Sequence, residues 1–266
     1  MATVAFLHAH PDDEAIVTGG TMASLAAGGH RVVLLTATGG ELGEFPPDLL
    51  VPGETLAVRR AAELDAAAAV LGVARLERLG YLDSGMAGTP GNSDPDCFAR
   101  ADTEAAATRV AAVLAEERAD VVVVYDEHGN YGHPDHVKAH EVGMRAAELA
   151  GTERVYLMTH NRDFLRSLLS LAADLGIHVD EDRLAMLDVL GEPERRITTR
   201  VDVTGHIGAK AAAMRAHASQ IGETAFYLSL PDDVFAMVWG SEWYIRVRGT
   251  PGPVSEDDGR EPSLLA

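Results

Sequence analysis

The alternation of short apolar runs with longer alanine-rich segments is the feature that most restricts how this chain can fold. Five runs have the length and aliphatic content of β-strands, namely Val4–His8, Arg31–Thr36, Arg75–Leu79, Asp120–Tyr125 and Arg154–Met158. Four segments between them carry apolar residues at helical spacing, namely Ala15–Ala27, Thr55–Leu71, Thr103–Glu117 and Pro134–Leu149. This alternation predicts an α/β fold, Rossmann-like and doubly wound, with a mostly parallel sheet and helices on both faces.

The pattern changes after Met158. We expect two more helices and two more extended segments, at Asn161–Leu175, His206–Ser219, Arg196–Val203 and Glu242–Val247. No Ser- or Pro-rich linker sets this half apart, so we expect one domain over residues 1–248, with a core over 1–160 and a C-terminal elaboration over 161–248. The mixture of Gly, Pro and acidic residues in 249–266 predicts a mobile tail.

The charge balance excludes several classes of partner. The chain has 41 acidic and 22 basic residues, so its surface repels polyanions, and we expect neither nucleic acid nor an anionic membrane as a partner. Cys97 is the one cysteine, which excludes internal disulfides and fits a reducing compartment. No signal peptide and no apolar stretch of about 20 residues is visible, and we expect a cytoplasmic protein.

Two polar clusters follow the first and fourth expected strands. The first contains His10, Asp12 and Asp13, and the second contains His133, Asp135 and His136. In the common strand order 3-2-1-4-5, strands one and four are neighbours, and ligands bind in the crevice at their carboxyl ends. Imidazole nitrogen and carboxylate oxygen together suit a divalent cation such as zinc. The sequence therefore predicts that the two clusters face each other across a metal site.

Competing interpretations explain less of the pattern. A dinucleotide site would need a G-x-G-x-x-G motif after the first strand, and none is present. Acids at a helix N-terminus are favoured by the helix dipole, but this does not explain His10 and Pro11 in front of them. His136 and His140 lie four residues apart on one helix and form a rival metal pair, while His160 ends the fifth strand and is a weaker candidate for lining the site.

Arg60 lies on the apolar face of its helix, between Leu56 and Leu64. A buried arginine needs an anionic or hydroxylated partner, and the site is where we expect to find one. Arg59 has a simpler explanation as a partner of Glu63 on the solvent side.

The two clusters resemble the paired signature of the PIG-L (LmbE-like) family of zinc-dependent N-acetylglucosaminyl deacetylases. The residues that carry the resemblance are Ala9–Glu14 and Gly132–His136, and it extends from about Val4 to Gly143. The chain departs from many members at His128 and Asn130, near Tyr131.

The resemblance implies a role for each site residue. His10, Asp13 and His136 would bind one zinc ion per chain. Another divalent metal could take the place of zinc in the cell. Asp12 would be the general base, His133 would stabilise the oxyanion, Asp135 would tune His133, and Tyr131 would assist the tetrahedral intermediate. Glu44, Arg60 and Asp83 would hold sugar hydroxyls.

We therefore expect a hydrolase that removes the N-acetyl group from a small molecule containing N-acetylglucosamine. The alternatives are an amidase acting on a larger N-acyl substrate, such as a thiol conjugate or an acylated antibiotic, and a non-catalytic module that binds metal or sugar.

Overall fold

A seven-stranded sheet forms the centre of the protein. In the computed structural model, which describes residues 1–46, 48–174, 185, 187–221 and 228–265, the strand order is β3-β2-β1-β4-β5-β7-β6. The strands are β1 Thr3–His8, β2 Arg31–Thr38, β3 Arg75–Tyr81, β4 Val121–Tyr125, β5 Arg154–Thr159, β6 Thr199–Asp202 and β7 Ser241–Arg248. The first five strands are parallel, which confirms the predicted doubly wound order and the adjacency of β1 and β4.

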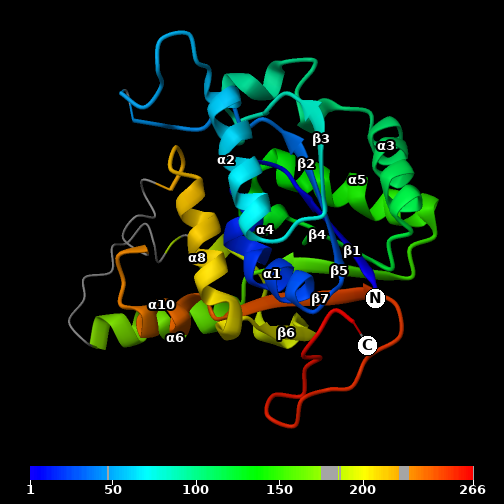
Figure 1. Cartoon of the computed structure of the whole chain (residues 1–266), viewed down its shortest axis with the longest axis vertical. Helices are drawn as coiled ribbons and strands as arrows, with labels where there is room; N and C mark the ends of the chain where they lie inside the picture. Colours follow the sequence, from blue (N-terminus) through cyan, green and yellow to red (C-terminus); the bar gives the residue numbers. More distant parts are fainter. Residues whose placement is uncertain (47, 175–184, 186, 222–227, 266) are drawn as a thin grey trace.

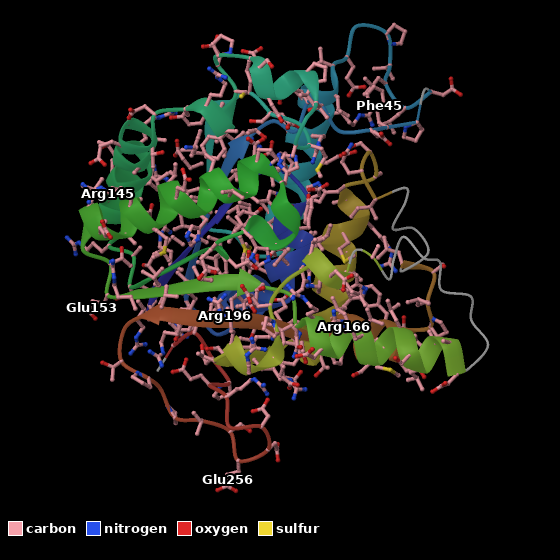
Figure 2. The ribbon with its side chains drawn as sticks, turned by 180° about the vertical axis from the view of Figure 1, so that it is seen from behind. Phe45, Arg145, Glu153, Arg166, Arg196 and Glu256 are labelled. Atoms are coloured by element: carbon pink, nitrogen blue, oxygen red, sulfur yellow. The ribbon has the colours of Figure 1, made fainter. Side chains whose placement is uncertain are left out.

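Helices cover both faces of this sheet. They are α1 Gly19–Ala27, α2 Leu56–Val70, α3 Thr103–Glu117, α4 Gly129–Gly132, α5 Pro134–Ala150, α6 Arg162–Asp174, α8 Ile207–Ala216 and α10 Asp232–Trp239. Short π- or 3₁₀-helical turns lie at η1 Glu14–Thr18, η2 Pro90–Ser93, η3 Phe98–Arg100, η4 Glu194–Arg196 and η5 Thr204–His206. Figure 1 shows α1, α2 and α8 in front of the sheet, and the rear view in Figure 2 shows the opposite face covered by α3 and by α5, which carries the labelled Arg145.

The central strands are apolar because both of their faces are covered. Every residue of β4 is buried, and Phe6 of β1 lies beside Leu34 of β2 and Val123 of β4. Helix α5 approaches this layer closely at Gly143, where a Cβ atom would lie 2.3 Å from a methyl group of Val124. Helix α5 therefore packs closely on β4 at this point.

The helix expected at Ala15–Ala27 does not begin as an α-helix. Residues Glu14–Thr18 form a single π-helical turn, and the α-helix starts at Gly19. Such turns are rare and often occur next to functional sites.

The C-terminal half completes the same sheet. Strand β7 runs antiparallel to β5, and β6 runs antiparallel to β7. The buried Glu242 of β7 accepts hydrogen bonds from the main-chain N–H groups of Gly20 and Thr21, both at 2.8 Å, and pairs with the buried Lys210 of α8 at 2.5 Å. These contacts tie the second half of the chain to α1.

The segment after β7 returns to the sheet, whereas the sequence predicts a mobile tail there. Glu261 is 3% exposed and accepts hydrogen bonds from Thr199 Oγ1 at 2.9 Å and from Arg246 Nε at 3.0 Å. Leu264 is buried in the core. Composition does not reveal this packing, because it depends on one carboxylate and one leucine.

Across the described residues, no helix has the combined length and apolar character that a membrane span requires.

Candidate metal centre and its pocket

The loops that follow β1 and β4 bring the two polar clusters together. His10 Nδ1 lies 3.3 Å from His136 Nε2, and Asp13 Oδ2 lies 3.4 Å from each of these two nitrogens. A tetrahedral metal ion with bonds of about 2.0–2.1 Å holds its ligand atoms about 3.3–3.4 Å apart. The separations of the three atoms match one face of such a tetrahedron, as expected for residues that could hold one metal ion together.

His133 stands next to this group. One nitrogen each from His10, His133 and His136 lies within 4.8 Å of the others, and the rings of His10 and His133 are 4.5 Å apart. Two histidines of the second cluster thus face one histidine of the first.

Neighbouring residues fix the orientation of the three ligand candidates. The Tyr125 hydroxyl donates to Asp13 Oδ2 at 2.7 Å, and the Tyr125 ring stacks on His136 with 4.2 Å between centroids. His10 Nε2, on the far side of the ring from Asp13, lies 3.2 Å from Asp135 Oδ2. A carboxylate behind a histidine ligand in this way sets the tautomer and the ring orientation.

The site electrostatics suit a cation. Burial works against the charge on Asp13, but His136 and His10 hold the pKa of this carboxyl well below its usual range. Burial likewise opposes charge on His10, but hydrogen bonds to Asp13, Asp135 and Asp83 raise its pKa well above the ordinary value.

Asp12 differs from its neighbour in backbone and in environment. Its φ of 112° lies in a region that residues other than glycine rarely adopt. Its Oδ2 lies 3.2 Å from Arg60 Nη2. Burial raises the pKa of Asp12 to about 6, although Arg60 acts in the opposite direction.

Arg60 finds the anionic partner that its position on the helix predicts. Besides Asp12, it donates to the carbonyl oxygen of Gly40 at 2.6 Å and to that of Pro11. Gly40 has a φ of 62°, and a Cβ atom there would lie 2.3 Å from Arg60 Nη1, so the loop needs glycine at this point.

The prediction that Arg59 pairs with Glu63 is wrong. Arg59 pairs with Glu54 at 2.7 Å, and Glu63 is buried elsewhere.

His133 caps α5 with its side chain. Its Nδ1 accepts the main-chain N–H of Asp135 at 3.1 Å, so the proton of the neutral ring is assigned to Nε2. Burial, together with His10 and His136, lowers the pKa of His133 to about 4. The carboxylate of Asp135 is directed to His10 and to Ser84, whose N–H donates to it at 2.9 Å.

Tyr131 lies at the rim and is 39% exposed, with its ring 5.0 Å from that of His136. Burial and the carboxylates of Asp13 and Asp12 raise the pKa of Tyr131 well above its usual value. The neighbouring Asn130 has a φ of 63° and donates its N–H to Asp126 Oδ1 at 2.7 Å. His128 Nδ1 lies 3.5 Å from the same oxygen, so Asp126 anchors both departures from the family pattern.

Two loops beyond the metal centre are bound to each other. Leu42 N–H donates to Asp83 Oδ2 at 3.2 Å, and Asp83 N–H donates to Glu41 Oε1 at 2.9 Å. Asp83 Oδ1 also lies 3.6 Å from His10 Nε2, and it is 6% exposed. Glu44 is exposed on the loop between β2 and α2, next to Phe45, which Figure 2 shows on a loop that extends from the body of the protein.

These loops and the metal centre surround a pocket of about 1000 Å³. Its floor includes His10, Asp12, Asp13 and His133, and its wall includes Glu44, Arg60, Asp83, Met86, Tyr131 and Gln220. Such a volume accommodates a substituted sugar.

The rival histidines have other partners. His140 Nδ1 lies 2.8 Å from the carbonyl oxygen of Tyr125. His160 lines a separate cavity of about 160 Å³ with Lys210 and Trp243. The pair of His136 and His140 therefore does not converge on one point.

Sequence reasoning missed four residues around this site. Tyr125 and Ser84 contact the carboxylates of Asp13 and Asp135. The polar end of an otherwise apolar strand was the available signal for Tyr125. His217 and Gln220 come from the chain after α8, where His217 Nε2 lies 2.5 Å from Glu14 Oε1 and Gln220 lines the pocket. No local pattern relates them to the first cluster.

Comparison with known proteins places this chain among deacetylases. The family model described as GlcNAc-PI de-N-acetylase (PIG-L) matches residues 5–147. A 1D-myo-inositol 2-acetamido-2-deoxy-alpha-D-glucopyranoside deacetylase of Thermomonospora curvata is 41% identical over 288 residues, which cover 99% of this chain and 96% of the relative.

Two solved structures share the fold. N,N'-diacetylchitobiose deacetylase from Pyrococcus horikoshii has a TM-score of 0.59 at 22% sequence identity, and the match covers 93% of this chain and 84% of the deacetylase chain. The zinc-inhibited form of a teicoplanin deacetylase has a TM-score of 0.57 at 17% sequence identity, and the match covers 94% of this chain and 100% of the deacetylase chain.

Proposed function

Since this chain belongs to the PIG-L family of metal-dependent deacetylases, we propose that it removes the N-acetyl group from an N-acetylglucosamine linked to inositol or a similar small polyol. The observation that carries the proposal is the triangle of candidate ligand atoms of His10, Asp13 and His136, of which His10 and Asp13 line a sugar-sized pocket. The close relative named for that substrate aligns over nearly the whole chain.

The proposed metal is zinc, held by His10, Asp13 and His136. Two imidazoles and one carboxylate would give the ion three protein ligands, the number found in catalytic zinc sites. When bound, such an ion supplies a water ligand of lowered pKa and polarises the acetyl carbonyl.

Asp12 is the proposed general base. Its pKa of about 6 leaves it ionised at neutral pH yet basic enough to accept a proton from the attacking water. Because Arg60 holds one of its oxygens, the carboxylate has a fixed direction.

His133 is the proposed partner of the developing oxyanion. With Nδ1 occupied by the Asp135 N–H, its Nε2–H donates to the acetyl oxygen as that atom gains charge. Asp135 holds His133 through this main-chain contact and holds His10 through its carboxylate. Tyr131, at the rim, is proposed to donate its hydroxyl to the tetrahedral intermediate, because its raised pKa keeps it protonated.

Glu44 and Asp83 are proposed to hold sugar hydroxyls, since both line the pocket and offer carboxylate oxygens. Arg60 is proposed to join them, since it also lines the pocket. Its Nε has no partner among the described residues, while its Nη1 and Nη2 atoms hold Asp12 and two carbonyl oxygens.

The test is acetate release from N-acetylglucosaminyl-inositol by protein that has been stripped of metal and then given one equivalent of zinc. We expect release with zinc and none after chelation. A teicoplanin-type N-acyl glycopeptide is the comparison substrate. Turnover of the glycopeptide alone would favour the antibiotic amidase, and binding of sugar without any release would favour the non-catalytic module.

A further inference from the structure

The segment that follows α8 brings residues of the C-terminal half of the chain to the pocket, which Ser219 and Gln220 line, and to Glu14. His217 and Glu14 are both 0% exposed, and His217 Nε2 lies 2.5 Å from Glu14 Oε1. His217 Nδ1 has no partner among the described residues, so the hydrogen bonding of this ring is directed at Glu14. Two residues later, Ser219 donates its N–H and its hydroxyl to Glu63 at 3.0 and 2.6 Å.

The second oxygen of Glu14 continues the chain of contacts. Glu14 Oε2 accepts the main-chain N–H of Asp12 at 2.9 Å. Asp12 has a φ of 112°, and a residue held in such a sparsely populated conformation costs about 1–3 kcal/mol, so it persists only where the surroundings impose it. Arg60 fixes the carboxylate of Asp12, and Glu14 is the contact that fixes its peptide N–H.

A purely structural interpretation of the Glu14–His217 pair explains less. A buried ion pair is often no more stabilising than apolar side chains of similar volume, because both charges must leave water. What this pair adds is its position, since an apolar pair could not accept the Asp12 N–H.

We propose that His217 is a positioning residue for the deacetylation. His217 orients Glu14, and Glu14 in turn holds the main chain of Asp12 in the conformation that directs the Asp12 carboxylate at the attacking water. The inference rests on the proposed role of Asp12 as general base. The His217 side chain is hydrogen-bonded to Glu14, which is neither a proposed metal ligand nor part of the pocket lining.

Two substitutions at the same position separate geometry from packing. In His217→Gln, the amide nitrogen takes the place of Nε2 and still reaches Glu14. In His217→Asn, the amide nitrogen takes the place of Nδ1 and does not. We expect His217→Asn to lose about 10–100-fold in kcat, because small misplacements of a catalytic group cost up to about 10²-fold. Its KM and its metal content should stay within about twofold of the parent, and His217→Gln should keep kcat within about threefold.

A readout independent of turnover is hydrogen exchange of the Asp12 amide in the metal-free protein. Exchange should be faster in His217→Asn than in His217→Gln. Tyr244→Phe serves as a control for lost stability, because the Tyr244 hydroxyl is buried against Thr21 and Glu242, outside the site. This control should keep the parental kcat.

Parental kcat in His217→Asn, an equal loss in both His217 variants, or a loss that matches missing metal would overturn the inference. If His217→Asn does not fold, Glu14→Gln and Glu14→Met replace it. Gln retains an acceptor for the Asp12 N–H and Met does not, so equal kcat in these two would overturn it as well. Asp12→Asn is the reference variant. Full activity of Asp12→Asn would refute the proposed general base itself. An inactive Asp12→Asn together with a fully active His217→Asn would refute only the role of His217.

Discussion

At the scale of single residues, Asp12 and Asp13 are adjacent carboxylates with opposite environments. The φ of 112° at Asp12 turns the chain between them, so that Asp13 faces His10 and His136 while Asp12 faces Arg60. The pKa of Asp13 lies well below its usual range, and burial raises that of Asp12 to about 6. One carboxylate is thus suited to bind a cation and the other to accept a proton.

Substituting each acid in turn should separate these roles. We expect Asp12→Asn to keep one equivalent of zinc and to lose about 10²–10⁴-fold in activity, the usual contribution of a positioned general base. Asn tolerates positive φ, so the loop should keep its shape. Asp13→Asn should lose both metal and activity. Metal analysis and acetate release measure both effects, and zinc-free Asp12→Asn would contradict the assignment.

At the scale of elements, the site depends on how β1 and β4 end. Both strands are apolar along their length and become polar at their carboxyl ends, where parallel neighbours bring those ends to one edge. Tyr125 is the last residue of β4, and it contacts Asp13 through its hydroxyl and His136 through its ring. The strand end therefore orients ligand candidates from both clusters.

Tyr125→Phe should weaken zinc binding about 10–100-fold without unfolding the protein, because it removes the donor to Asp13 and keeps the stacked ring. Competition with a chelator of known affinity measures the change. Tyr156→Phe on the adjacent strand β5 is the matched control, since its hydroxyl lies 3.4 Å from Glu261, outside the pocket lining. Unchanged affinity in Tyr125→Phe would show that the hydroxyl does not support Asp13.

At the scale of the whole molecule, the two halves of the chain form one structure. The family model ends at residue 147, yet β7 pairs with β5, and the segment after α8 delivers contacts to Glu14 and Glu63. The last residues contribute as well, through the buried Glu261 and Leu264.

A chain ending at Gly249 should be less stable and still active. Removing a buried leucine typically costs about 2–5 kcal/mol, which for a protein of this size lowers Tm by roughly 5–15 °C. The pocket lining comes from residues before 221, so kcat should stay within about twofold of the parent. Calorimetry and acetate release test both parts, and an unchanged Tm would mean that the tail is mobile, as its composition suggests.

The sequence determined the five parallel strands and the loops that carry the site, because apolar periodicity and the polar ends of strands are local properties. The order of these five strands followed from the order that is common in doubly wound sheets. It also indicated a buried partner for Arg60, since one charge on an apolar helix face is visible in a linear pattern. The tertiary structure alone decided that Asp135 stands behind His10, that Asp12 adopts a φ of 112°, and that His217 meets Glu14 from 203 residues away. Side-chain direction and partners so distant along the chain depend on how the elements pack, and no spacing in the sequence encodes that packing.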